Sequence, residues 1–416
     1  MKKIAWQRVG VPTVAFFQEG PGLRNWQWTD SGMKVINGTN IRDDGRFDPS
    51  NTTRAISLEE FKAKYRHFAI DANDIVVASS GTLGKAARVK AEHLPMMMNT
   101  SVIRFRANDR ARLDDGFLFA WLRSRDFLDQ ALGMATGAAQ QNFGPSHVKQ
   151  MTLPLPAIAE QRRIASILSA YDDLIENNTR RIAILEEMGR RTCEEWFVRF
   201  RFPGHKGVRM VESELGLVPD GWAIRAFDEI AMFTNGFAFK PEHLGTEGAP
   251  IVKIKELKAG VQADTPRFNG SLPDRYRIKH GDLLFSWSAD LDVYVWGNEE
   301  GWLNQHLFLV AALEPATPGS YLFHALKTAM PSFRTRSNGA TMKHIKRSAL
   351  SEVKTAVPPV QVAVAFDQAV GPLHELVKVL SRKNRNLRTT RDLLLPKLIS
   401  GELDVSALPE PEALAA

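Results

Sequence analysis

The chain has very little cysteine. Cys193 is the only one among 416 residues, which excludes internal disulfides and a cysteine-based zinc site. No run of 18 apolar residues occurs, so we expect no membrane-spanning helix and no membrane partner. No apolar stretch follows Met1-Lys2-Lys3, so we expect no secretory signal peptide and a cytoplasmic protein.

Motifs that carry catalysis are also missing. The ten histidines show neither an HExxH pattern nor paired metal-ligand spacing. The turn 80–86 resembles the end of a phosphate-binding loop, but Ser79 stands at the position of its first glycine and Ala86 replaces the metal-binding hydroxyl. We found no glycine-rich strand–turn–helix for a nucleotide and no Pro-Pro-Tyr methyltransferase motif. We therefore expect a chain that is not an enzyme and binds neither a metal nor a cofactor.

A metal nuclease is a weaker alternative. Asp220, Glu256 and Lys258 could be arranged as acid, acid and lysine around a metal ion. The spacing is so loose that chance explains it, and the sequence around Asp220 is an ordinary turn signal.

The remaining composition is that of a globular protein with a positive charge. Hydrophobic residues make up 44% and charged residues 24%, which excludes bulk disorder. The net charge of +7 and the pI of about 9.4 favour a polyanionic partner.

A long helix is predicted from Pro156 to Trp196. Apolar side chains recur there at alternating steps of four and three, as in the seam of a coiled coil, and charged residues fill the other faces. A polar residue in such a seam costs stability but fixes register. The predicted seam consists of Ile164, Leu168, Tyr171, Ile175, Asn178, Ile182 and Leu185.

The same pattern returns 202 positions later without a gap. Pro372 falls inside this second helix and should kink or break it. The alternative to a coiled coil is two amphipathic helices that lie on separate cores. The second predicted seam consists of Phe366, Val370, Leu373, Val377, Leu380, Asn384 and Leu387.

The globular stretches before the two helices also repeat. Segment 73–76 corresponds to 281–284, segment 99–102 to 304–307, and the offset drifts from 216 to 202. We therefore predict an α+β fold in which two α/β domains are separated by two long helices that pair as an antiparallel coiled coil, with an internal pseudo-two-fold repeat. The predicted segments are a first domain at 1–154, a spacer helix at 155–202, a second domain at 203–355, a spacer helix at 356–402 and a flexible tail at 403–416.

Basic and amide side chains gather in both globular stretches. Arginine and lysine neutralise phosphates, whereas amides pair bidentately with adenine. For any one residue the simpler interpretation is a solvated surface position, but the clusters together favour nucleic acid. Strand 102–106 alternates apolar and basic residues, which predicts a half-exposed strand with a cationic face. The DNA-binding candidates are Lys85, Arg88, Arg104, Arg106, Gln140, Gln141, Asn142, Lys253, Lys255, Lys343, His344 and Lys346.

Six segments together resemble the specificity subunit of type I restriction–modification systems, and they cover nearly the whole chain in the expected order. The segments are 73–85 (NDIVVASSGTLGK), 153–164 (LPLPAIAEQRRI), 216–222 (GLVPDGW), 281–286 (GDLLFS), 303–308 (LNQHLF) and 391–403 (RDLLLPKLISGEL). Two departures stand out. Segment 357–363 lacks the Glu-Gln pair of Glu160 and Gln161, so one docking face is expected to differ, and the first domain lacks the Pro-Asp-Gly-Trp of the second.

The resemblance implies a function as well as a fold. Each globular domain would be a target-recognition domain that reads half of a bipartite site on double-stranded DNA. The helices would form a spacer of fixed length on which methyltransferase subunits dock. S-adenosylmethionine would bind to the partner methyltransferase, which methylates adenine, and a motor-nuclease restriction subunit could join. A coiled-coil adaptor without DNA specificity remains the alternative.

Overall fold

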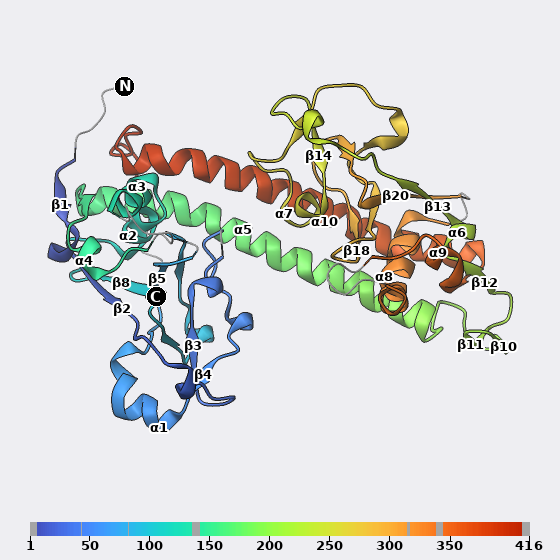
Figure 1. Ribbon diagram of the computed structural model, residues 1–416, viewed down its shortest axis with the longest axis horizontal. Coiled ribbons are helices and arrows are strands. Elements are labelled where there is room, and N and C mark those ends of the chain that lie inside the picture. The colour runs from blue at the N-terminus through green and yellow to red at the C-terminus, as the bar shows by residue number, and fades with distance from the viewer. Residues whose placement is uncertain are drawn as a thin grey trace. The chain divides into compact units, whose positions relative to one another are not determined.

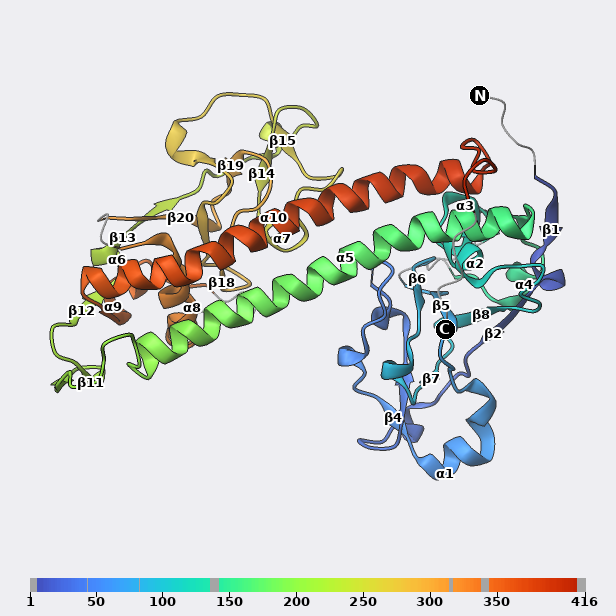
Figure 2. The same ribbon diagram turned by 180° about the vertical axis from the view of Figure 1, so that it is seen from behind.

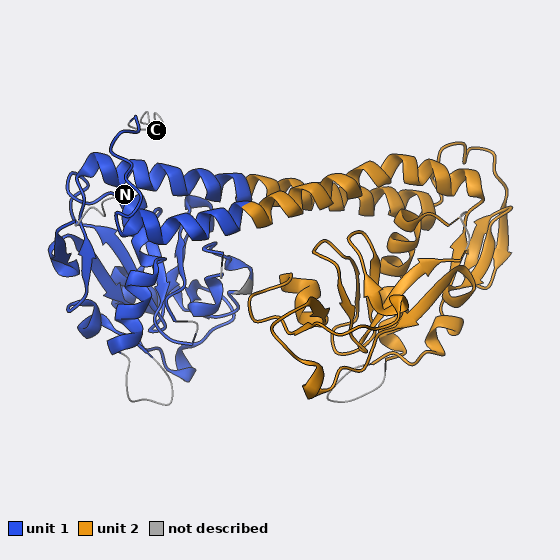
Figure 3. Ribbon diagram, turned by 90° about the horizontal axis from the view of Figure 1, so that it is seen from above, with its two compact units in different colours: residues 1–175, 387–416 blue, residues 176–386 orange. Residues whose placement is uncertain are grey.

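The computed structural model describes residues 6–42, 44–81, 83–134, 142–313, 317–337 and 344–409. The chain divides into two compact units, shown in Figure 3. Unit 1 comprises residues 1–175 and 387–416, and unit 2 comprises residues 176–386.

Unit 1 contains a four-stranded antiparallel sheet and a three-stranded mixed sheet, which can be followed in Figure 2. In the large sheet the strand order is β2 (Ala15–Glu19), β8 (Val102–Ala107), β5 (Ile75–Ala78) and β6 (Ala86–Arg88). In the small sheet it is β4 (Ala55–Ile56), β3 (Met33–Ile36) and β7 (Met97–Met98), with β3 and β7 parallel. The other elements are the paired strands β1 (Arg8–Gly10) and β9 (Thr152–Pro154) and the helices α1 (Leu58–Glu60), α2 (Asp115–Leu122), α3 (Arg125–Met134) and α4 (Pro145–Val148).

Strand β5 explains why unit 1 has a core on each side of its large sheet. Its four residues are all buried, as the apolar run predicts. Ile75 and Val77 pack in one cluster with α2, α3 and the two long helices, whereas Val76 and Ala78 pack in a second cluster on the opposite face.

Unit 2 repeats this plan. In its large sheet the order is β13 (Ala231–Asn235), β20 (Leu307–Ala312), β17 (Leu283–Ser286) and β18 (Asp292–Val295). In the small sheet it is β15 (Arg267–Phe268), β14 (Ala249–Val252), β19 (Gly301–Leu303) and β16 (Arg277–Ile278), with β14 and β19 parallel. The other elements are the strand pairs β10 (Met210–Ser213) with β11 (Gly216–Pro219) and β12 (Ala223–Ala226) with β21 (Lys354–Val357), and the helices α6 (Phe227–Ile230), α7 (Ile254–Ala259), α8 (Gly319–Thr335) and α9 (Ala349–Glu352).

The large sheets of the two units correspond strand for strand, whereas unit 2 adds strand β16 to its small sheet and has the extra pair β10–β11. Both large sheets place the equivalent strands in the same order, both small sheets contain one parallel pair, and both units close with an antiparallel pair just before a long helix. The predicted internal repeat and mixed α+β class are therefore confirmed.

Two long helices run through both units (Figure 1). Helix α5 spans Ile158–Cys193 and α10 spans Val360–Ile399, inside the predicted spacer segments. The expected break at Pro372 is wrong, because α10 continues through it. The side chain of Pro372 is exposed, while Val370 and Leu380 on either side are buried. Packing of these neighbours holds the helix together despite the missing amide donor.

Candidate nucleic-acid interface and helix seam

In each unit, the residues that follow a buried strand, β5 in unit 1 and β17 in unit 2, pair with the segment that precedes a short helix, α4 or α9. In unit 1 the backbone amide of Phe143 donates to the Ser79 carbonyl at 3.1 Å, and Ser80 bridges to Asn142. In unit 2 the amide of Ile345 donates to the Trp287 carbonyl at 2.8 Å, and Ser288 bridges to His344.

The predicted contact residues Asn142 and His344 thus lie at equivalent places. Asn142 is exposed and His344 is half-buried. Lys85 lies immediately before β6, in the turn that follows Ser80, and is half-buried. Three other candidates, Gln140, Gln141 and Lys343, lie outside the described residues.

Arg104 is not part of an exposed cationic face, and this prediction is wrong. Its side chain is buried, and its guanidinium donates to the carbonyls of Ala69 and His67 and to Oε1 of Gln18. Burial lowers its pKa from the ordinary arginine value. The alternation of apolar and basic residues misled us because segment 67–69 covers Arg104 and accepts its hydrogen bonds, so the side chain is an internal link and not a surface cation.

Arg106 and Arg88 are also engaged within unit 1. Arg106 pairs with Asp71 and Asp74, which raises its pKa. Arg88 donates to the backbone carbonyl of Asp115 at 3.2 Å and lies over the ring of Phe119. Both side chains hold the sheet to neighbouring segments, so a phosphate would have to compete with these partners.

The candidates in unit 2 are more accessible. Lys255 is exposed and pairs with Asp264 at 2.6 Å, which raises the pKa of Lys255. Lys253 is half-buried and precedes α7, where its backbone amide donates to the buried carboxylate of Glu256. Lys346 is exposed.

A loop that the sequence analysis overlooked has the same frame in both units. Gly20 and Gly236 follow the first strand of each large sheet, and a Cβ atom on either would lie about 2 Å from a backbone carbonyl, of Asn99 and Asn304 respectively. Only glycine fits this close approach.

The same loop then makes a short turn pinned by one side chain. In unit 1 the backbone amide of Arg24 donates to Oε1 of Gln27 at 2.7 Å. In unit 2 the amide of Lys240 donates to Nδ1 of His243 at 3.1 Å. The offset of 216 that relates these residues could have revealed the loop, since it already aligned the first strands of the small sheets.

The middle residue of this short turn differs between the units. In unit 1 it is Trp26, whose side chain is 76% exposed, and in unit 2 the equivalent residue is Glu242, which is also exposed. The next residue, Gln27, anchors this turn, because its side-chain amide donates to Glu60 at 2.8 Å and to Tyr65 at 3.0 Å. A rigid loop that presents a bare indole on one unit and a carboxylate on the other is suited to contact two different targets.

The seam of the long helices has two parts. All fourteen predicted seam residues are buried or half-buried. In unit 1, Ile164 and Leu168 of α5 share a core with Leu398 and Ile399 of α10. In unit 2, Asn178 donates to Asn384 at 2.9 Å, and Asn384 donates to Thr179 at 3.1 Å. Within each unit the segments run antiparallel, as predicted.

Gln161 has an internal role rather than a place on a docking face. It is fully buried and donates to the carbonyls of Arg112 and Pro156, while its Oε1 accepts from the amide of Asp114. It therefore fixes the first turn of α5 to the segment before α2. Its counterpart in the second helix is Ala363, which is buried and cannot make these bonds.

Catalytic alternatives gain no support from the described parts of the chain. Within them, no group of three histidine, cysteine or acidic side chains is placed to hold a metal ion. Glu256, required by the nuclease hypothesis, instead accepts from Lys253 and Thr265. None of the described helices has the length and apolarity needed to cross a membrane.

Comparisons with known proteins agree on one family. The sequence model described as "Type I restriction modification DNA specificity domain" matches twice, at residues 24–187 and 219–369. The type I restriction enzyme MjaIX specificity subunit of Methanocaldococcus jannaschii is 24% identical over 308 residues, which cover 70% of each chain. The MjaVIII specificity subunit of the same organism is 20% identical over 382 residues, covering 85% of this chain and 84% of the relative.

A solved structure shares the fold. The crystal structure of the type I restriction–modification system S subunit from M. genitalium matches 95% of this chain and 96% of its own, with a TM-score of 0.58 and 18% sequence identity.

Proposed function

The chain belongs to the family of type I restriction–modification specificity subunits, and we propose that it reads a bipartite site on double-stranded DNA, one half with each unit. The observation that carries the proposal is the pair of equivalent loops that present Trp26 in unit 1 and Glu242 in unit 2. Two copies of one scaffold with different exposed residues are what the recognition of two different half-sites requires.

The chain acts in a larger complex in the cytoplasm. It catalyses nothing itself and binds no cofactor. Methyltransferase subunits, which carry S-adenosylmethionine and methylate adenine, dock on the helices, and a restriction subunit joins them. The antiparallel helices set the distance between the half-sites, because a helix rises a fixed amount of about 1.5 Å per residue.

Salt dependence of DNA binding tests this proposal. Fluorescence anisotropy with a long duplex should give a logarithm of affinity that falls linearly with the logarithm of salt concentration, by about 0.9 for each phosphate contacted. Affinity that does not change with salt, or no binding at low salt, would favour an adaptor without a DNA role.

A further inference from the structure

Arg54 is a cation of unit 1 that keeps its hydrogen-bond donors free. Its side chain is exposed, and across the described residues no carboxylate or carbonyl oxygen accepts a hydrogen bond from its guanidinium. The sequence-predicted arginines of unit 1 differ in this respect, because Arg88, Arg104 and Arg106 each bind a carbonyl or a carboxylate of their own unit. Arg54 can therefore meet a ligand without giving up an internal partner.

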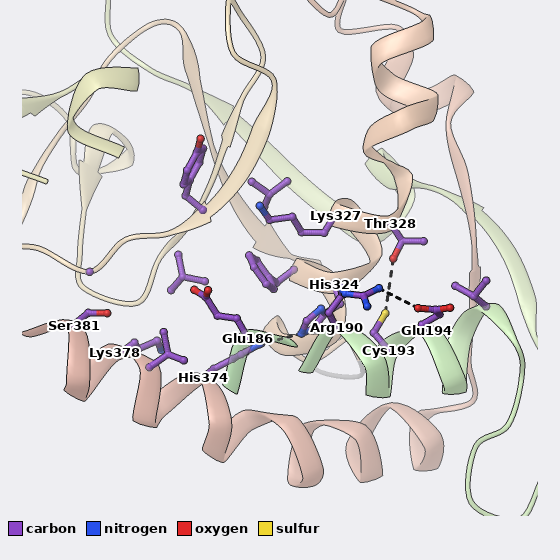
Figure 4. Close-up of a pocket in the computed structure, with 17 residues that line it drawn as sticks. Glu186, Arg190, Cys193, Glu194, His324, Lys327, Thr328, His374, Lys378 and Ser381 are labelled. Carbon is purple, nitrogen blue, oxygen red and sulfur yellow. Dashed lines mark hydrogen bonds and ion pairs between the residues drawn. The ribbon is translucent and has the colours of Figure 1, made fainter. Parts of the chain in front are cut away.

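The cations around a cavity of about 750 Å³ in unit 2 are paired as well. This cavity lies where the end of α5 and the middle of α10 meet α8 and β18 (Figure 4). The imidazoles of His324 and His374 stack in its wall with their Nε2 atoms 3.0 Å apart, and burial lowers the pKa of both, that of His324 to about 3. The lysines and the arginine of the wall have acidic partners: Arg190 with Glu194 at 3.0 Å, Lys327 with Asp292 at 2.7 Å and Lys378 with Glu375 at 2.7 Å. The described wall thus offers DNA no unpaired cation.

An indole ring holds the Arg54 guanidinium in place. Its Cζ atom lies over the ring of Trp28, 5.1 Å from the centroid. Trp28 is half-buried and packs against the cluster that contains Met33, Val35 and Ile56. Stacking occupies one flat face of a guanidinium and leaves the N–H groups at its edge available, in a fixed plane.

The backbone fixes both partners of this stack. The amide of Val35 donates to the Arg54 carbonyl at 3.0 Å, and the amide of Thr29, next to Trp28, donates to the Ala55 carbonyl at 2.9 Å. The segment before β4 and the loop after β2 are therefore joined at the point where the two side chains meet.

Unit 2 forms the same backbone junction without the stack. There the amide of Ile251 donates to the Pro266 carbonyl at 2.8 Å, and the amide of Gly245 donates to the Arg267 carbonyl at 2.8 Å. These bonds place Pro266 at the position of Arg54 and Leu244 at the position of Trp28. Since the repeat builds this junction with neither a cation nor an indole, the scaffold does not require the stacked pair.

We propose that Arg54 is a specificity-determining residue that reads a guanine in the half-site of unit 1, through two parallel hydrogen bonds to O6 and N7. This bidentate pairing is the commonest base-specific contact of arginine. Alignment on Trp28 before binding reduces the conformational entropy that the contact costs. The loop that carries Trp28 also presents the exposed indole of Trp26, so both side chains belong to one surface. The inference rests on the proposed function, and Pro266 predicts that the half-site of unit 2 lacks this contact.

Maps of methylated adenines test the inference, with the full chain co-expressed with the methyltransferase subunit of its own system. In Arg54→Ala and Arg54→Lys, the preference for guanine at one position of one half-site should fall by about fivefold or more. Lysine keeps the charge but lacks the planar fork of donors, so a contact to phosphate would survive in Arg54→Lys.

Two further variants separate positioning from general damage. Trp28→Leu introduces the residue of unit 2 and should relax the same position to a smaller extent, because the guanidinium loses its platform. Arg112→Ala removes an exposed arginine elsewhere in unit 1 and should give the motif of the unchanged chain.

Four results would overturn the inference. They are a parent motif without a G·C pair, a split motif that stays the same in Arg54→Ala, a loss of methylation in Arg54→Ala that Arg54→Lys restores with the parent motif, and relaxation in both half-sites. A parent chain that directs no split methylation would defeat the proposed function and this inference with it, whereas an unchanged split motif in the Arg54 variants would defeat the inference alone.

Discussion

Trp26 is the single residue from which we expect the largest effect on DNA recognition. Its indole is 76% exposed on a loop fixed by Gln27, so truncation removes a contact surface without disturbing a core. Trp26→Ala should lower DNA affinity by about tenfold, the effect of losing one hot-spot aromatic, and change the unfolding free energy by less than about 0.5 kcal/mol. Anisotropy and urea titration measure the two quantities.

Leu58→Ala provides the matched control, because Leu58 is another large exposed apolar residue of unit 1. It should leave the affinity within twofold of the unchanged chain. Equal affinities of the Trp26 and Leu58 variants would remove Trp26 from the interface.

The stacked pair His324 and His374 predicts a dependence of stability on pH. The folded-state pKa of both imidazoles lies below the ordinary value of 6.5. The unfolded chain therefore takes up more protons as pH falls through 6.5, and the unfolding free energy decreases until pH approaches the folded value, about 3 for His324. Between pH 7.5 and 5 the loss should reach up to about 2 kcal/mol for each histidine that stays neutral.

Urea unfolding at the two pH values measures this loss. The double variant with His324→Gln and His374→Gln should lose much less stability on acidification. His280→Gln, which replaces an exposed histidine of unit 2, should behave as the unchanged chain. A parallel decline in all three proteins would show that other groups cause the pH dependence.

At the scale of elements, the Asn178–Asn384 bond is the most specific feature of the helix seam. A single Asn178→Leu change leaves the buried Asn384 amide short of a partner, and we expect a loss of about 1–3 kcal/mol in unfolding free energy. Replacing both asparagines by leucine should restore that stability or exceed it, at the expense of a fixed register.

Urea titration of the two single variants and the double variant gives the coupling between the asparagines. Additive losses in the double variant would mean that the two side chains do not act as a pair.

Periodicity and internal repetition allowed the elements to be predicted well from the sequence. The seam from Ile164 to Leu185 is a local pattern, so the sequence alone reveals it, and the constant offset of 202 identifies its copy. Strand β5 could be recognised by its four apolar residues because it is buried on both faces.

Tertiary context decided what the sequence could not predict. Arg104 alternates with apolar residues as a surface cation would, yet it is buried and bonded to segment 67–69. Gln161 lies in a segment expected to dock partners, yet it bonds to Arg112 and Asp114 of its own unit. The exposure of Trp26 could not be predicted, because a single tryptophan in a sequence can be either buried in a core or exposed on the surface.

At the scale of the whole molecule, the two helices should act as a ruler. Insertion of seven residues into α5 between 181 and 182, and of seven into α10 between 380 and 381, preserves the seam because both insertions are one heptad long. Each helix then grows by about 10 Å at 1.5 Å per residue. The gap between half-sites should lengthen by about three base pairs at roughly 3.4 Å each.

The half-site sequences themselves should not change in this variant. A control with seven residues inserted in only one helix should no longer recognise the split site, because the seam residues of the two helices are then out of register. A changed half-site, or an unchanged gap, would contradict a spacer of fixed length.

The most direct test of the central claim is to co-express the chain with the methyltransferase subunit of its own system and to map methylated adenines across the host genome. Our account predicts one split motif, with two different halves separated by a constant gap. A contiguous motif, or no adenine methylation while the two subunits form a stable complex, would contradict it.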